Sequence, residues 1–278
     1  MPVIHFGDLT GRKRKVEDAA ARKRLLQARY LAWAVTLHIL GPAGERATHA
    51  SLLKAAPIAG YRVERPEGGP IGSLFGKKVV GGPLDDAVHL QLKNELGVPT
   101  GVVSVPIEVK NVREWIYPGS ERLHQLLHKA AALQDANPEL PIVPVLVCRR
   151  APWATFRMAK AFGFYVADAK AQFLPEREDV SQTHVEEMRV ELGYSDLVID
   201  TGRNRLLDKH FGKALPGIAE DAASSWAIFG PRYLETFEAL RQPTLSEARR
   251  SELTLELESE GRRILRDRQG DEDEDEVD

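Results

Sequence analysis

The feature that most constrains the fold is a change of hydrophobic period in the middle of the chain. Apolar and polar residues alternate from Leu84 to Leu92 and again from Gly101 to Lys110 (GVVSVPIEVK). A period of two is typical of strands that bury one face. Because residues 94–101 between them are of turn type, the pattern predicts an antiparallel hairpin. Pro106 lies inside the second of these strands. Proline is typical of edge strands, so it argues against a central, fully paired position in the sheet for this strand.

Strand and helix signals alternate after this hairpin. In order, the segments are a helix over Ser120–Asp135, a short apolar strand over Ile142–Cys148, a helix over Trp153–Phe162 that stops at Gly163, and a strand over Phe164–Ala167. This order predicts a parallel portion beside the hairpin. The expected fold class is therefore α/β: a mixed β-sheet flanked by helices.

Both ends of the chain are predicted to be helical. Residues 16–40 have helical spacing and are expected to stop at Gly41-Pro42, a shorter helix covers Ala47–Ala56, and residues 65–82 are rich in Gly and Pro. Helical candidates after Pro175 are residues 183–192, 219–229, 232–240 and 245–268. We expect a helical N-terminal region over 1–70, a core over 71–178, a helical C-terminal region over 179–268 and a disordered acidic tail over 269–278.

Composition narrows the class of protein. Hydrophobic residues make up 43% of 278, which is enough for a sizeable core. The single cysteine, Cys148, excludes an internal disulfide framework and a thiolate zinc site. The first residues lack the apolar segment of a signal peptide, and the apolar stretch around Tyr30–Leu40 is too short to cross a bilayer. We therefore expect a soluble, cytoplasmic protein with no membrane partner.

Net charge is uneven along the chain. The formal charge is −3, but residues 271–278 (DEDEDEVD) carry seven acidic side chains. The remainder is therefore basic overall, with a dense cluster near the N-terminus (Arg12, Lys13, Arg14, Lys15, Arg22, Lys23, Arg24). Such a cluster can meet phosphate, although a solvated helix face explains it equally simply.

The string Ile107-Glu108-Val109-Lys110-Asn111 carries the chemistry. Glu108 and Lys110 are two apart on a strand, so they project the same way about 6.5–7 Å apart. The hairpin could bring Asp85 beside Glu108. Two carboxylates can hold a hard cation such as Mg²⁺, and a nearby lysine can stabilise negative charge on a phosphodiester. Asp86 is the second candidate, because it would point toward the core with Val88 and Leu90.

These residues are similar to the PD-(D/E)xK nuclease superfamily, and in particular to its nuclease-related and Holliday-junction-resolvase-like branches. The resemblance covers roughly residues 71–175. It implies that Asp85 and Glu108 bind Mg²⁺ or Mn²⁺, that Lys110 is the catalytic lysine, and that Gln125 faces the site from the next helix. Some members of the superfamily also use an acid on an upstream helix, but the only nearby acids before Asp85, Glu64 and Glu67, lie in an expected loop.

Several residues are candidates for contacting DNA. The resemblance includes Asn111, which follows the E-x-K triplet. His89 shares a strand face with Asp85, and Arg149 and Arg150 follow a strand end, where chains often line a cleft. For His89 a space-filling role on the sheet is the alternative, and for the arginines a simple surface role. The helical regions could bind a protein partner, and a homodimer would suit cleavage of both DNA strands.

His124 and His128 are four residues apart on a predicted helix, a spacing that can chelate zinc. With no third ligand nearby, the expectation is that they lie on a solvated helix face.

The function expected is that of a metal-dependent DNA endonuclease, in a setting such as prokaryotic defence, repair or mobile elements. The first alternative is a catalytically inactive nuclease-fold module that binds nucleic acid or scaffolds a complex. In that case Glu108 and Lys110 form only an ion pair at a strand end. The second alternative is an unrelated helical interaction protein built around a small sheet.

Overall fold

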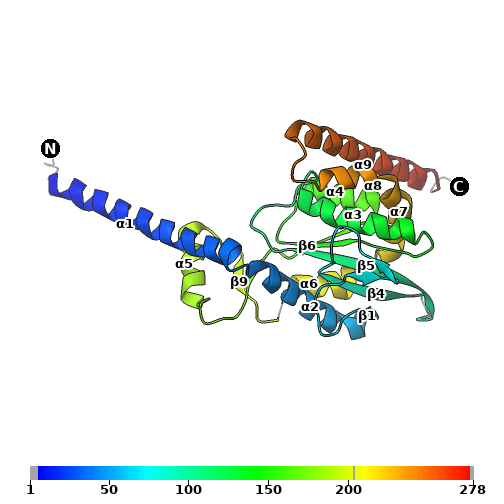
Figure 1. The fold of residues 1–278 in the computed structure, drawn as a ribbon, viewed down its shortest axis with the longest axis horizontal. Coiled ribbons are helices and arrows are strands. Elements are labelled where there is room, and N and C mark those ends of the chain that lie inside the picture. The colour runs from blue at the N-terminus through cyan, green and yellow to red at the C-terminus, as the bar shows by residue number, and fades with distance from the viewer. Residues whose placement is uncertain (1–5, 95, 203, 276–278) are drawn as a thin grey trace.

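A five-stranded mixed sheet lies at the centre of the computed structural model, which describes residues 6–94, 96–202 and 204–275 (Figure 1). Its strand order is β1 (Tyr61–Val63), β4 (Asp86–Lys93), β5 (Pro99–Lys110), β6 (Val145–Cys148) and β7 (Tyr165–Asp168). The pairs β1–β4 and β4–β5 are antiparallel, whereas β5–β6 and β6–β7 are parallel. The predicted mixed sheet, with a hairpin beside a parallel portion, is confirmed.

The register of the hairpin follows from its alternating pattern. Asp86 pairs with Ile107 and Val88 pairs with Val105, so the next position along places Asp85 opposite Glu108. The apolar members of β5 are buried on one face of the sheet. A slip of one residue would turn these side chains to the other face, so burial fixes which residues of β4 and β5 meet.

Helices cover both faces of the sheet (Figure 1). One layer comprises α3 (Glu121–Ala136), α4 (Trp153–Phe162), α7 (Ala219–Arg232), α8 (Leu234–Leu240) and α9 (Glu247–Asp275). The other comprises α2 (Leu40–Ala59), α6 (Arg205–Lys209) and a turn of π-helix, η2 (His210–Ala214). The sheet therefore has an apolar core on each face.

The helix α4 has the predicted bounds and ends at Gly163, whose φ is +83°. This left-handed conformation favours glycine. Space requires it as well, because a Cβ here would lie 2.2 Å from the carbonyl oxygen of Ala222 in α7. Gly163 thus both ends α4 and allows α7 to pack closely.

The N-terminal helices differ from expectation. Helix α1 (Phe6–Leu31) continues into a π-helical turn, η1 (Ala32–Thr36), and α2 begins at Leu40. The predicted stop at Gly41-Pro42 was wrong, because Pro42 lies in the first turn of α2, where its missing N–H needs no acceptor. The helix predicted over Ala47–Ala56 is the interior of α2. Residues 43–46 are therefore helical as well.

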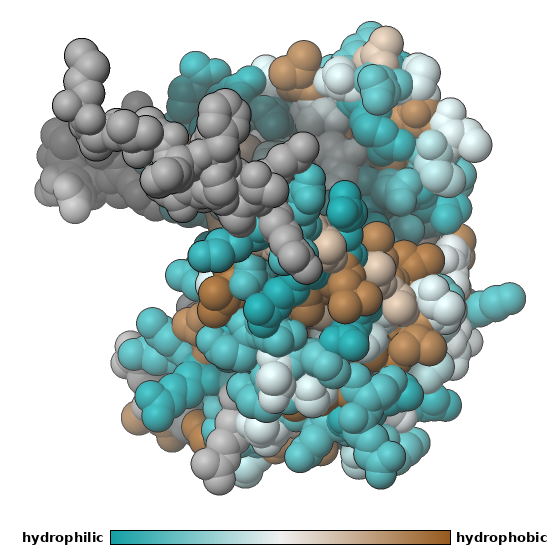
Figure 2. All heavy atoms as spheres, turned by 90° about the vertical axis from the view of Figure 1, so that its left-hand side faces the viewer, coloured by the Kyte–Doolittle hydropathy of each residue, from teal (hydrophilic) through white to brown (hydrophobic). Residues whose placement is uncertain are grey.

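A smaller hydrophobic cluster lies where α1 meets α5 (Gln182–Leu192) and a two-stranded sheet of β8 (Gln172–Leu174) and β9 (Leu197–Ile199). Leu26, Tyr30 and Trp33 form its N-terminal side. Beyond it α1 projects away from the body (Figure 1). Figure 2 looks onto this end of the molecule, which is mostly hydrophilic with hydrophobic residues gathered near the middle.

The expected division of the chain does not follow the packing. Strand β1 lies before residue 71 but belongs to the central sheet, and α7–α9 pack on α3 and α4. The segment 65–82 contains a short hairpin, β2 (Ser73–Leu74) and β3 (Lys77–Lys78). Helix α9 extends to Asp275, so part of the predicted disordered tail is helical, and residues 276–278 lie outside the described chain. Within the described residues, no helix has the length and apolar character needed to cross a membrane.

Candidate active site

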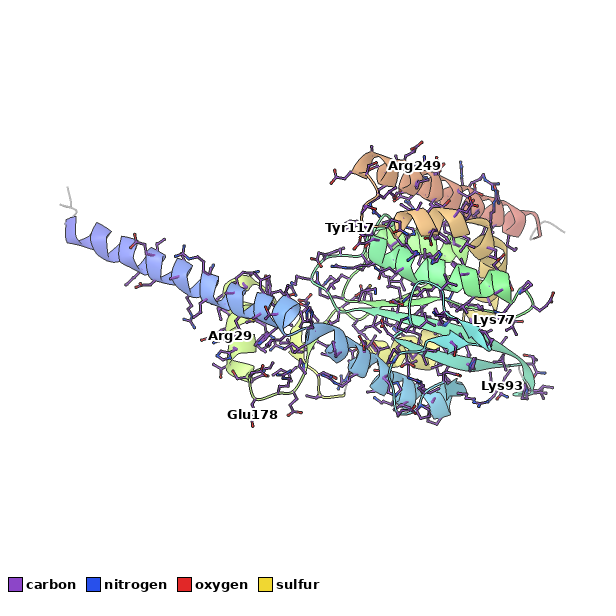
Figure 3. All side chains as sticks on the ribbon, viewed as in Figure 1. Arg29, Lys77, Lys93, Tyr117, Glu178 and Arg249 are labelled. Carbon is purple, nitrogen blue, oxygen red and sulfur yellow. The ribbon has the colours of Figure 1, made fainter. Side chains whose placement is uncertain are left out.

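Asp85 is fixed to the strand that carries the E-x-K residues. Its backbone N–H donates to the carbonyl oxygen of Ile107 (3.2 Å), and its Oδ2 accepts the N–H of Val109 (2.6 Å). The aspartate therefore lies at the carboxyl end of β5, the end of the sheet near Tyr117 and away from Lys93 (Figure 3). The structure brings Asp85 together with Glu108 and Lys110.

Glu108 is 4% exposed and holds two ammonium groups. Its Oε1 accepts from Lys110 Nζ (3.0 Å) and from Lys129 Nζ (3.1 Å), and its Oε2 accepts from Lys129 Nζ (2.8 Å). Lys129 also donates to the carbonyl oxygen of Pro83 (2.6 Å). Burying a carboxylate is costly unless its charge is paired, and here two lysines pair it.

Lys129 is a site residue that the sequence analysis missed. It is a lysine, yet it is buried on α3 between the buried residues Leu126 and Leu133. That position was the available signal, because lysine is almost never buried without a partner. The predicted site residue Gln125 is half-buried one turn earlier on the same side of α3. Among the described residues it makes no hydrogen bond to Asp85 or Glu108.

Glu45 of α2 supplies an acid on an upstream helix. The side chain is half-buried, and both Lys110 and Glu108 lie close enough to influence its charge. Burial raises the pKa of Glu45, and the Lys110 ammonium opposes that rise. The neighbouring Gly44 allows this approach: a Cβ there would lie 2.5 Å from Cβ of Asn111.

Neither acid named in the sequence analysis takes the upstream position. Glu64 instead contacts His89, and Glu67 is exposed in the loop after β1. Glu45 was missed because the predicted helix boundaries left residues 43–46 in a linker. Once α2 is one continuous helix, Glu45 faces the carboxyl end of β5.

The cluster holds several acidic side chains close together, which affects their pKa values. Burial, and then the charge of Glu108, raise the pKa of Asp85 to about 6. The N–H of Val109 and the Lys110 ammonium act in the opposite direction but do not restore the ordinary value. A carboxylate kept near other carboxylates despite this penalty is a candidate for function.

The donor chemistry fits a hard divalent cation. Asp85 and Glu108 offer carboxylate oxygens, and Mg²⁺ is usually held by one or two carboxylates while it keeps several waters. Within residues 6–94, 96–202 and 204–275 no three His, Cys, Asp or Glu side chains form a ready-made metal cluster. A cation here would therefore rely on water and substrate for its other ligands.

Asp86, the second candidate metal ligand, lies on the opposite face of the sheet from Glu108. Its Oδ2 is 2.7 Å from Nδ1 of His49 on α2, and its Oδ1 accepts the N–H of Ala87 (2.8 Å). Burial raises the pKa of Asp86, and the contact with His49 opposes that effect. The structure does not bring Asp86 into the site.

Asn111 was expected to contact DNA, and its surroundings correct that expectation. The residue is 5% exposed, and Nδ2 donates to the carbonyl oxygens of Leu40 (2.6 Å) and Phe173 (2.8 Å). Its Oδ1 accepts the N–H of Phe173 (2.9 Å). Both ends of the amide are used inside the protein, so Asn111 joins the start of α2 to β8 and has no free group for a phosphate.

Arg149 is also occupied within the protein. It is buried and donates to Asp196, which a second arginine, Arg113, contacts as well. The guanidinium of Arg113 lies 4.1 Å above the ring of Tyr194. Burial of Arg149 in this cluster corrects its assignment as a DNA contact. Arg150 remains partly exposed, with Nε 3.7 Å from Asp196, and is still able to reach a ligand.

Three histidines are held by neighbouring groups. His89 bridges Ser104 and Glu64, each at 3.0 Å, which matches the space-filling alternative for this residue. His124 and His128 are buried, so the expected solvated face was wrong. His124 Nε2 contacts the carbonyl oxygen of Pro118 (2.7 Å), and burial lowers its pKa to about 4.

Comparison with known proteins adds little to this description. No protein-family model matches the sequence, and no curated protein matches it either. Among solved structures, the chain is similar to the MspJI restriction endonuclease in complex with a 27-mer oligonucleotide, at 15% identity and a TM-score of 0.26. The match covers 78% of this chain but only 39% of that one.

Proposed function

We propose that this chain is a metal-dependent nuclease of the PD-(D/E)xK kind that hydrolyses phosphodiester bonds in DNA. The observation that carries the proposal is the meeting of Asp85 and Glu108 on paired strands, with Lys110 beside them. The nearby acid Glu45 adds support, because some members of the superfamily that the sequence resembles use an acid on an upstream helix. The proposal is based on this cluster and not on the fold, because one fold can support many activities.

The residues divide the work by their chemistry. Asp85 and Glu108 would hold the cation, which when bound supplies a Lewis acid and lowers the pKa of a water. Lys110 Nζ, with a side chain 16% exposed, can donate to a phosphate oxygen and stabilise the charge that develops during attack on phosphorus. Lys129 is a positioning residue, because it ties Glu108 to the carbonyl of Pro83.

Cleavage of plasmid and single-stranded DNA with Mg²⁺ or Mn²⁺ tests the proposal. We expect Glu108→Gln and Lys110→Ala each to reduce cleavage by about 10²-fold or more, since each removes a group that acts on the reacting phosphate. Glu139→Gln and Lys93→Ala are matched controls, because both residues are exposed and outside the cluster. Their cleavage rates should stay near that of the wild type.

A catalytically inactive module that binds nucleic acid is the second candidate. The observation that favours it is Glu108 itself, whose carboxylate already accepts hydrogen bonds from two lysines. If wild-type protein retains DNA binding but cuts no DNA with either metal, the nuclease proposal is wrong and this alternative replaces it.

A further inference from the structure

A groove between α4 and α9 combines a large exposed aromatic with clustered positive charge. It has a volume of about 680 Å³. Its lining includes Trp153, Arg157, Lys160, Arg262, Arg266 and Arg268. We call it the Trp153 groove. Phe156 and Leu265 add apolar surface to it, and none of the lining side chains that the structure describes is acidic.

Trp153 is unusually exposed for its size. It is 75% exposed, whereas Trp33 and Trp226 are buried in hydrophobic clusters. A large aromatic left in water beside apolar neighbours is typical of a surface that binds something. Its ring is available for stacking.

The positive charge of the groove is mostly uncompensated. Arg268 is held by Ser225 Oγ (2.9 Å), and Arg262 lies 3.7 Å from Glu258. Among residues 15–94, 96–202 and 204–269, whose side chains the structure describes, Arg157, Lys160 and Arg266 have no ion-pair partner. These three cations can therefore bind an anion.

The first residue of the groove follows shortly in sequence after β6, the strand that pairs with β5. Cys148, at the end of β6, pairs with Lys110, and Trp153 follows five residues later. The loop after β5 is tied to this segment: Ile116 donates its N–H to the carbonyl oxygen of Arg150 (3.0 Å) and accepts from Thr155 Oγ1 (2.8 Å).

Two more exposed aromatic residues flank Ile116, the residue that makes these two hydrogen bonds. Trp115 is 43% exposed and Tyr117 is 58% exposed, on either side of the buried Ile116. Exposed aromatic side chains therefore lie on the loop that leaves β5 and at the start of α4, the helix that follows β6.

We propose that the Trp153 groove binds a single-stranded stretch of nucleic acid, with a base stacked on Trp153 and phosphates on Arg157, Lys160 and Arg266. This inference rests on the proposed nuclease function and narrows its substrate to DNA with unpaired bases. A duplex keeps its base faces covered and cannot use an exposed ring. An acidic peptide would use the charges but leave the aromatic without a stacking partner. Base–aromatic stacking contributes about 1–3 kcal/mol per base.

The test measures binding of the full chain without metal, in EDTA, so that no cleavage occurs. A labelled oligothymidylate and a duplex of equal length are compared by fluorescence anisotropy at one salt concentration. We expect Trp153→Ala to weaken single-strand binding about 5- to 100-fold, and Trp153→Phe to retain most of it. Ile58→Ala is the control, because Ile58 is an exposed apolar residue of α2 outside this groove. Unchanged thermal unfolding shows that each variant folds.

Charge variants and tryptophan emission give independent readouts. Arg157→Ala and Lys160→Ala should each reduce the slope of log affinity against log salt by about 0.7, the value for one phosphate on a single strand. Lys93→Ala should leave the slope unchanged. Oligothymidylate should quench the emission of the wild type, and Trp153→Phe should remove most of that quenching.

Two results overturn the inference. One is single-strand binding no tighter than duplex binding and unaffected by Trp153→Ala. The other is quenching of Trp153 by a peptide of residues 271–278 but not by the oligonucleotide, which would assign the groove to an acidic segment. Cleavage is measured separately, so loss of the nuclease proposal leaves binding testable. Equally, if the protein cleaves DNA but the Trp153 groove does not bind the oligonucleotide, only this inference is rejected.

Discussion

Two buried carboxylate clusters in this molecule look alike and behave differently. Asp196 is held by Arg113 and Arg149, and these two arginines lower its pKa. At the other cluster Glu108 is held by two lysines, yet the pKa of the adjacent Asp85 rises to about 6. The first cluster has one acid among cations, whereas the second gathers several acids near the same cations.

The difference separates structure from function. A single carboxylate between arginines satisfies its own charge and joins the loop after β5 to the segment before β9. A second and third carboxylate beside Glu108 add repulsion that folding does not require. Such crowding persists where a cation or substrate relieves it. Substitutions at the two clusters should therefore change stability in opposite directions.

The largest effect is expected at the arginine cluster. Asp196→Ala leaves the buried Arg149 and the half-buried Arg113 without their shared anion, which should reduce the free energy of unfolding by about 3 kcal/mol. Urea denaturation measures this change. Cleavage per folded molecule should stay within a few-fold of the wild type, and a loss as great as that of Glu108→Gln would show that the two clusters are not separate.

A buried group without an ionic partner provides the next test. The pKa of His124 is about 4 in the folded protein, against an ordinary value of 6.5. As pH falls from 6.5 to 4 the unfolded chain gains a proton that the folded chain cannot take. This histidine should therefore cost up to about 3 kcal/mol of stability over that interval, and nothing above it.

His124→Gln should flatten this pH dependence, as measured by urea denaturation at pH 7, 5.5 and 4.5. Asp196→Ala should not flatten it. An unchanged slope in His124→Gln would mean that another group controls acid sensitivity.

A smaller effect, opposite in sign, is expected at the acid cluster. Asp85→Asn removes the repulsion from Glu108, while its side-chain oxygen can still accept the N–H of Val109. The raised pKa sets an upper limit of roughly 3 kcal/mol, and we expect a gain in unfolding free energy of about 1 kcal/mol. Clear destabilisation would identify Asp85 as a structural residue.

Magnesium provides a further test of the difference between the two carboxylate clusters. A cation that binds only the folded state stabilises it by mass action, by about 1.4 kcal/mol at tenfold excess over Kd. Thermal unfolding of the wild type should therefore shift upward with Mg²⁺, whereas Asp85→Asn should shift little. Equal shifts in both proteins would place the cation elsewhere.

Local pattern predicted most of the centre of this fold, although β5 is central in the sheet despite Pro106. Alternation predicted which side chains of β4 and β5 share a face, and the observed register places Asp85 opposite Glu108. Helix α4 was predicted with its correct bounds, because Gly163 is a strong stop signal. These features depend on residues close together in sequence.

The parts that were missed depend on distant contacts. Glu45 reaches the site only because α2 continues through Gly41-Pro42 and crosses β5 at Gly44. Lys129 can be recognised as a site residue only once the fold has brought Glu108 and Pro83 into contact with it. Asn111 resembled a ligand contact by position, but α2 and β8 occupy its amide. The hydrophobic period within one segment does not show which distant residues its side chains will contact.

The coverage of the sheet has a consequence for synthesis of the chain. The face formed by Val103, Val105 and Val145 is covered partly by α2, but also by Phe211 and Ala219 near the end of the chain. A chain emerging from the ribosome would complete the whole sheet some 40 residues before that cover appears. During this interval an apolar surface is open to water and to neighbouring nascent chains. Truncations that stop after β7 should therefore aggregate, and the C-terminal third protects the sheet as well as completing it.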